Sequence, residues 1–153
     1  MTEQEKRKRR CCFTGHRPEK LNRPEAEIIA WLESEIRKAV DDGFVTFISG
    51  MARGVDIWAA EIVLRLRDEE FPIHLICASP FEGFERSWEE SWRLRYAEVM
   101  RKADLVKYIC KSYSRACISW TTLYPQAPLP FTVSITDLTV QAFSYNTALN
   151  EMG

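Results

Sequence analysis

Two glycine-containing segments of the sequence carry residue types that suit the binding of an anion. The first, T-G-H-R, combines a hydroxyl, a flexible glycine, an imidazole that titrates near neutrality and a permanently charged guanidinium. The second, S-G-M-A-R-G-V-D, has two glycines that let a ligand approach the main chain, an arginine and a terminal aspartate. Phosphate or carboxylate recognition is the chemistry that these types favour. The candidate ligand-binding residues are Thr14, Gly15, His16, Arg17, Ser49, Gly50, Met51, Arg53, Gly54 and Asp56.

Neither segment has the spacing of a known phosphate-binding fingerprint. The glycines of the second segment fit neither G-x-G-x-x-G nor G-x-x-x-x-G-K-[ST]. A tight turn between a strand and a helix is therefore an equal interpretation, with Asp56 capping the helix rather than accepting a ribose hydroxyl or acting as a base. For His16 and Arg17 the alternatives are a histidine that bonds loop carbonyls and a surface arginine.

The elements that must position these segments alternate between strand and helix. Residues 10–13 and 44–48 have the apolar composition of buried strands, and residues 73–77 and 105–110 are interpreted as the third and fourth strands. Helical spacing of apolar residues follows Pro24 up to Asp42-Gly43, and again from Val55 to Leu66. A third helix is predicted to begin at Ser87, where S-W-E-E has capping-box spacing, and to end near Ala103. This alternation predicts parallel strands in a doubly wound α/β sheet.

The loops that follow the first three strands are then expected at one edge of the sheet, where proteins of this class bind ligands. They cover residues 14–21, 49–56 and 78–85. In the third loop, Pro80 and Phe81 are expected to supply a wall of the site. Phe81 is equally suited to stacking on a planar ring and to closing the edge of the core. The aromatic residues at helical spacing are interpreted as core, namely Trp58, Trp88, Trp92 and Tyr96.

The bulk composition fits one globular domain over residues 1–153. The chain has 46% hydrophobic and 28% charged residues and a formal net charge of -1, so no global field draws it onto nucleic acid. Residues 6–10 are all basic, and residues 1–9 are interpreted as a solvated, flexible arm. Contact with phosphate or a targeting signal is the alternative interpretation of the basic run. No segment is apolar enough to span a membrane, and no secretory signal is visible. We expect a cytoplasmic protein.

The five cysteines and two histidines show no metal-ligand spacing. Cysteines in the apolar strand-like runs are expected to be reduced thiols, which behave as small hydrophobes. We therefore expect a reducing environment, no metal and no cofactor.

Beyond these local patterns, three stretches together resemble a known family. They are CCFTGHRPEKL, FISGMARGVDIWAAE and ASPFEGFERSWEESWRLRYAEVMRKAD. They resemble the YpsA-like family of the SLOG superfamily, to which the LOG-type phosphoribohydrolases and the DprA/Smf DNA-processing proteins also belong. The resemblance covers about residues 10–115. It implies a modified Rossmann-like three-layer fold with a mostly parallel sheet, and a nucleotide or nucleotide-derived ligand held by the two glycine segments.

The sequence departs from related patterns in two respects. The P-G-G-x-G-T-x-x-E motif of the LOG enzymes is absent, which counts against a LOG-type hydrolase. After Arg115 the family's R-N-x-x-M-V-D-like segment and its G-G-T-x-N-T-like turn are also missing, so residues 116–153 diverge from the family. A genuine divergence and a shifted reading frame both fit this tail. Within it, residues 131–140 are interpreted as one or two strands, and residues 142–152 as a short helix or a frayed end.

Three functions remain open at this stage. The first is a binding module for a nucleotide or a related phosphate, serving signalling rather than turnover. The second is a nucleoside-phosphate N-glycosidase with Asp56 and His16 as the candidate catalytic residues. The third is a DNA-binding protein of the DNA-processing type, which the net charge and the lack of a basic stripe disfavour. The expected partner is a small phosphorylated ligand rather than nucleic acid or membrane, and a homodimer stays an open alternative.

Overall fold

The computed structural model describes residues 9–15, 18, 23–108, 110, 131–136 and 139–144, with the backbone alone for 14–15, 131–136 and 139–144. His16 and Arg17 lie outside the described residues, as does the basic run 6–8. The first half of the chain alternates strand and helix as the sequence predicts. The elements are β1 (Arg10–Gly15), α2 (Glu25–Asp41), β2 (Thr46–Ser49), α3 (Val55–Asp68), β3 (His74–Ser79), α4 (Glu90–Lys102), β4 (Leu105–Tyr108), β5 (Phe131–Thr136) and β6 (Thr139–Ser144).

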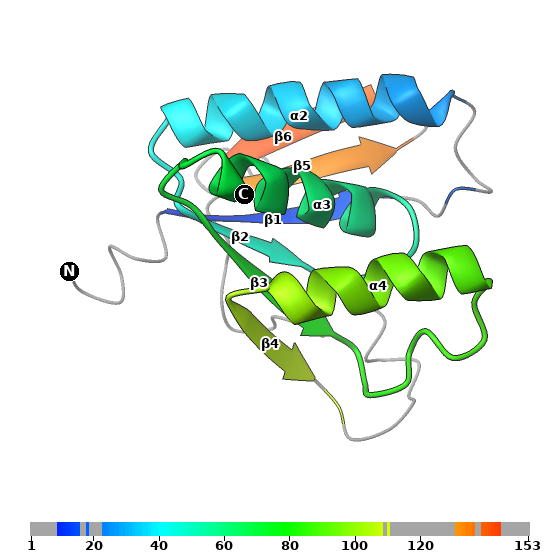
Figure 1. The fold of residues 1–153 in the computed structure, drawn as a ribbon. Coiled ribbons are helices and arrows are strands. Elements are labelled where there is room, and N and C mark those ends of the chain that lie inside the picture. Colours follow the sequence, from blue (N-terminus) through cyan, green and yellow to red (C-terminus); the bar gives the residue numbers. More distant parts are fainter. Residues whose placement is uncertain are drawn as a thin grey trace, which may run out of the picture.

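The strands form one six-stranded sheet in the order β4-β3-β2-β1-β5-β6. All neighbouring pairs are parallel except β5 and β6, which form an antiparallel hairpin. The prediction of an α/β, Rossmann-like fold with a mostly parallel sheet is confirmed. From β1 to β4 every crossover steps in the same direction, and right-handed crossovers of this kind place all their helices on one face. Figure 1 shows α2, α3 and α4 side by side across that face.

The main core lies between this helical layer and the sheet. The stripe predicted for α2 is buried at Ile28, Leu32, Ile36 and Ala39. Helix α3 lies between α2 and α4, which cover both of its sides. Ten of its residues are therefore buried. On the sheet side the rings of Phe13 and Phe47 stack with their centroids 5.9 Å apart.

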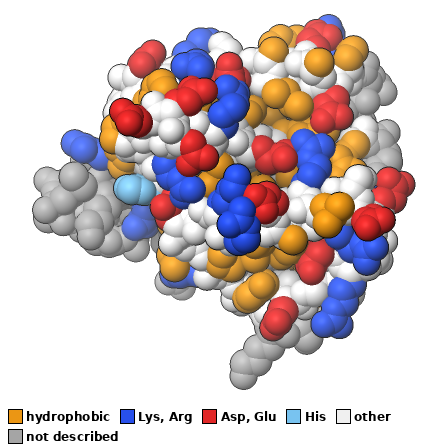
Figure 2. All heavy atoms as spheres, viewed as in Figure 1, with side chains coloured by type: hydrophobic (Ala, Val, Ile, Leu, Met, Phe, Trp, Pro, Cys, Tyr) orange, Lys and Arg blue, Asp and Glu red, His pale blue; other side chains and the backbone are white. Residues whose placement is uncertain are grey.

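The outer surface of the helical layer carries both signs of charge. Figure 2 shows acidic and basic side chains interspersed over the helices. Many of them are paired, and the Arg95 guanidinium donates to Glu61 at 2.5 Å and to Glu25 at 3.4 Å. Exposed pairs of this kind contribute little stability each, but they leave no single-sign field on this face.

Helix α4 begins later than the sequence predicts. The prediction that the helix begins at a capping box at Ser87 is wrong. The helix starts at Glu90, and the preceding residue Glu89 makes no side-chain cap. Aromatic packing accounts for the difference. The Trp88 ring meets Phe84 edge-on at 5.1 Å and Tyr96 at 5.6 Å, which holds the preceding residues in turns.

Other boundaries move by a few residues. Strand β1 continues through Thr14 and Gly15, which the sequence placed in a loop, because both pair with β5. The tail contains two strands, and β6 extends to Ser144. The expectation of a helix or frayed end from residue 142 is therefore wrong for residues 142–144.

The cysteines in the strands behave as predicted. Cys11, Cys12 and Cys77 are buried free thiols. Burial raises the pKa of Cys77 to about 12, so this thiol stays protonated and unreactive at neutral pH. Cys110, just beyond β4, is disulfide-bonded, so the expectation of reduced cysteines does not hold there.

Candidate functional site

The described part of the first glycine segment, Thr14 and Gly15, lies next to the second segment in space. Strands β1 and β2 are parallel neighbours with Cys12 opposite Ile48, so Thr14 and Gly15 run on beside the turn that follows Ser49. Strand β3 borders β2 on the other side, with Ser49 opposite Cys77. The ends of three neighbouring strands thus meet at one edge of the sheet, which is where a ligand is expected in this fold class.

Ser49 holds the turn after β2 in shape. Its hydroxyl donates to the main-chain oxygen of Asp56 at 2.8 Å and accepts from the Met51 N–H at 3.2 Å. Met51 has a φ of +64° and a fully buried side chain that packs into the core. Ser49 and Met51 therefore position the loop from within, whereas Ala52 and Arg53 at its crest are half-buried.

Asp56, just after this loop at the start of α3, is chemically the most distinctive residue at this strand end. Its side chain is 6% exposed, and Oδ2 accepts a hydrogen bond from the Ala52 N–H at 3.4 Å. The other oxygen, Oδ1, is buried and has no hydrogen-bond partner in the described part of the chain. Burial raises the pKa of Asp56 to about 7, and the Ala52 hydrogen bond opposes that rise only in part. A buried carboxyl oxygen without a donor is costly unless another group approaches it.

The N-terminus of α3 adjoins this carboxyl group. Gly54 precedes the helix with φ +92° and ψ -126°, and no side chain caps the first turn. The interpretation of Asp56 as the N-cap is wrong, since Asp56 is the second residue of the helix and bonds back to Ala52. The first-turn N–H groups and the positive end of the helix dipole favour a negative or hydrogen-bond-accepting group here.

The third strand end adds a polar pair that the sequence analysis missed. The hydroxyls of Ser79 and Tyr96 are hydrogen-bonded at 2.8 Å and buried. The charge of Glu85 contributes to the raised pKa of Tyr96, after the larger effect of burial. The Oε2 atom of Glu85 is buried without a partner among the described residues. Glu85 lies in the predicted loop 78–85, so its position in that loop was the available signal.

Phe81 makes an intramolecular aromatic contact at this strand end. Its ring meets Phe84 edge-on at 5.5 Å, and Phe84 in turn packs against Trp88. Pro80 accepts a hydrogen bond from the Cys110 N–H at 2.8 Å, which ties the loop to the end of β4. The aromatic residues predicted as core lie in or against the main core, confirming that interpretation for Trp58, Trp88, Trp92 and Tyr96.

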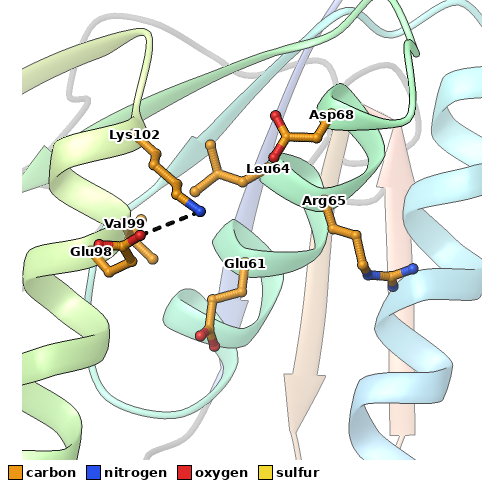
Figure 3. Close-up of a pocket in the computed structure, with 7 residues that line it drawn as sticks. All are labelled: Glu61, Leu64, Arg65, Asp68, Glu98, Val99 and Lys102. Carbon is orange, nitrogen blue, oxygen red and sulfur yellow. Dashed lines mark ion pairs between the residues drawn. The ribbon is translucent and has the colours of Figure 1, made fainter.

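A separate pocket of about 330 Å³ lies between α3 and α4, away from the strand ends (Figure 3). Its lining runs from the middle to the C-terminal end of α3 and includes the C-terminal half of α4. Helix α3 leads away from the strand ends at which it begins. Lys102 pairs with Glu98 at 3.3 Å, and Arg65 points toward α2, where it pairs with Glu33. Because these charges are compensated within the protein, the pocket offers no unsatisfied group comparable to Asp56.

No group of histidine, cysteine and acidic residues in the described ranges is arranged to hold a metal ion. Within the same ranges, none of the helices has the length and apolar character needed to cross a membrane.

Comparison with known families decides the relationship. The family model described as YspA SLOG family (YpsA) matches residues 11–119, which include β1 from its second residue, β2 to β4 and both glycine segments. The chain belongs to the YspA SLOG family. The part of this SLOG protein that the family model matches ends before β5 and β6.

Curated relatives of this SLOG protein carry the description "UPF0398 protein". One from Oceanobacillus iheyensis is 32% identical over 104 residues, covering 64% of this chain and 56% of the relative. Another from Lysinibacillus sphaericus is 34% identical over 107 residues, covering 65% and 59%. A third from Shouchella clausii is 35% identical over 81 residues, covering 52% and 43%. The chain spans about half the length of the curated relatives it matches. Their descriptions name no ligand and no reaction.

Proposed function

We propose that the protein is a cytoplasmic binding module for a nucleotide or a nucleotide-derived small molecule at the carboxyl edge of its sheet. The observation that carries this proposal is the buried Asp56 Oδ1, which has no donor within the described structure. A ribose hydroxyl is a neutral donor that could satisfy this oxygen, and in dinucleotide-binding α/β folds an acidic residue beyond the Gly-rich turn accepts a hydrogen bond from the ribose.

The phosphate of such a ligand would need positive charge and main-chain N–H groups nearby. The sequence supplies His16 and Arg17 directly after Gly15, the last residue of β1. Strand β1 is the neighbour of β2, which leads into the turn before Asp56. The α3 N-terminus adds its dipole on the same side. Ribose at Asp56 and phosphate toward Arg17 is therefore the orientation that we propose.

The test is calorimetric titration of the full chain with AMP, ADP-ribose and 2′,3′-dideoxy-AMP. We expect the ribose-containing ligands to bind at least about tenfold more tightly than the dideoxy compound, because loss of a hydrogen bond to a buried charged group costs about 1.5–3 kcal/mol. Asp56→Asn is expected to abolish this preference. Arg17→Ala is expected to weaken the binding of AMP and of dideoxy-AMP by the same factor, since both ligands carry the phosphate that Arg17 would contact.

Asp41→Asn is the matched control, because Asp41 is exposed at the opposite end of α2 from the site. It should leave every affinity unchanged. Absence of binding by all three ligands at millimolar concentration would reject the proposal, and equal binding of ribose and dideoxyribose ligands would remove Asp56 from it.

A second candidate function is supported by the titration of the same carboxyl group. A pKa of about 7 lets Asp56 exchange a proton at neutral pH, as a general acid or base of an N-glycosidase must. Incubation with purine nucleoside monophosphates and detection of free base tests this candidate. If the rate of base release changes with pH near the Asp56 pKa of about 7, and is lost in Asp56→Asn, the enzyme would be favoured over the binding module.

A further inference from the structure

Three buried side-chain atoms lack a hydrogen-bond partner in the described part of the chain, and all three adjoin the carboxyl edge of the sheet. They are Asp56 Oδ1, Trp58 Nε1 and Glu85 Oε2. Asp56 and Trp58 are 6% and 3% exposed and lie in the first turn of α3, whereas Glu85 lies in the turns between β3 and α4. Figure 1 shows α3 and α4 beginning on the side at which β2 and β3 end. Buried polar atoms without partners are rare, so their gathering at one edge indicates that a ligand completes them.

The turn that carries Glu85 is held over the end of β3. The Trp88 N–H donates to the main-chain oxygen of Glu85 at 3.0 Å. The Trp88 ring meets Tyr96 edge-on at 5.6 Å, and the Tyr96 hydroxyl is hydrogen-bonded at 2.8 Å to Ser79, the last residue of β3. The main-chain position of Glu85 is therefore fixed by contacts with α4 and β3.

The start of α3 is held over the end of the neighbouring strand. Ser49, the last residue of β2, donates its hydroxyl to the main-chain oxygen of Asp56 at 2.8 Å. Ser49 lies opposite Cys77, and Ser79 is two residues farther along β3, on the same face as Cys77 because side chains alternate. Neighbouring strands are about 4.8 Å apart. The carboxylates of Asp56 and Glu85 thus belong to adjoining strand ends, so that one nucleotide can contact both.

The chemistry of a carboxylate distinguishes the nucleotide bases. An ionised carboxylate only accepts hydrogen bonds, and its two oxygens can accept from two N–H groups that lie side by side. Guanine presents such a pair, its N1–H and its N2 amino group. Adenine and cytosine present one amino group next to a ring nitrogen that is itself an acceptor, and uracil presents a single N–H between two carbonyl oxygens. Guanine is therefore the base whose edge fits a carboxylate best.

We propose that the ligand at this edge is a guanine nucleotide whose N1–H and N2 amino group bind the Glu85 carboxylate. This inference rests on the proposed function, which has the ribose at Asp56. The unpartnered Oε2 of Glu85 then gains a donor from the base, as the Oδ1 of Asp56 does from the ribose. Glu85 thereby determines base specificity, whereas Asp56 contacts a part that all ribonucleotides share.

Calorimetric titration of the full chain with GMP, IMP and AMP tests this proposal. IMP is matched to GMP except for the missing N2 amino group. We expect GMP to bind more tightly than IMP or AMP by a factor of about ten or more, because each of these loses a hydrogen bond to a charged acceptor. Glu85→Gln should weaken GMP binding about tenfold or more and change IMP and AMP binding much less, since its amide presents an N–H donor in place of one carboxylate oxygen.

Glu82→Gln is the matched control for the loss of charge. Glu82 lies three residues before Glu85 in the same series of turns, and its side chain is exposed. This variant should leave all three affinities unchanged. Far-UV circular dichroism and thermal melting show that each variant is folded.

The outcomes separate this inference from the proposed function on which it rests. Equal binding of GMP, IMP and AMP would overturn the inference and leave the nucleotide-binding function intact. An equal loss of all three affinities in Glu85→Gln would also overturn it, since Glu85 would then shape the loop rather than contact the base. If none of the three nucleotides binds at millimolar concentration, the proposed function fails together with the inference.

Discussion

Asp56→Asn is expected to make the protein more stable at pH 8 and to leave its stability nearly unchanged at pH 4. In the unfolded chain this carboxyl group has its ordinary pKa of 3.8, and burial raises the folded-state pKa to about 7. Below pH 3.8 both states are protonated, so the group makes no difference. As pH rises toward 7 the unfolded chain ionises first, and stability falls by about 1.4 kcal/mol per pH unit. Asparagine removes this ionisation and keeps the acceptor for the Ala52 N–H.

At pH 8 the free energy of unfolding of Asp56→Asn should exceed that of the wild type by up to about 4 kcal/mol, the upper limit for a shift of about three pKa units. Urea unfolding at pH 4, 5, 6, 7 and 8 measures it directly. The Asp41→Asn control should give a constant offset across the series. A wild-type protein whose stability does not decline between pH 4 and 7 would show that the Asp56 charge is compensated, and the proposed ribose contact would lose its physical basis.

Gly54→Ala is expected to lower the free energy of unfolding by about 3 kcal/mol. Gly54 has φ +92° and ψ -126°, a region that residues with a Cβ occupy only under strain. Its carbonyl also accepts the first hydrogen bond of α3, from the Trp58 N–H at 2.9 Å. Relief of the strain would rotate this carbonyl and displace the start of the helix that carries Asp56.

Gly43→Ala provides the comparison for this measurement. Gly43 also has a positive φ, +95°, and an added Cβ there would meet nothing within 4 Å. It follows the C-terminus of α2, a position that tolerates other residues at a cost of about 1 kcal/mol. Chemical denaturation of the two variants should separate them by about 2 kcal/mol. An equal decrease in the free energy of unfolding for Gly54→Ala and Gly43→Ala would mean that the turn before α3 accommodates the added Cβ without strain.

Much of the architecture was predictable because apolar periodicity determines it. The stripe of α2, the buried run of β2 and the neighbouring β1 and β2 ends follow from local sequence and from the rules of parallel sheets. The start of α4 was not predictable in this way. A local capping pattern at Ser87 competed with the packing of Trp88 against Phe84 and Tyr96, and those contacts depend on the folded structure.

The candidate site was predictable as a place but not in its detailed chemistry. Residue types identified Asp56, yet its raised pKa and its unpartnered oxygen come from burial that no local pattern reveals. The Ser79–Tyr96 hydrogen bond joins residues seventeen positions apart, so only the packing of α4 on β3 brings it about. His16 and Arg17 lie outside the described residues, so their roles stay predictions from sequence.

The strand order has a consequence for how far relatives can inform on this molecule. Strand β1 lies between β2 and β5, and Gly15 pairs with Ile135. One flank of the first glycine segment is thus formed by the family's shared region, and the other by a hairpin beyond residue 119, where the family match stops. Whatever selectivity that second flank imposes comes from a part of the chain that the family match does not cover. A ligand established for one of the UPF0398 relatives would need to be tried afresh on this protein.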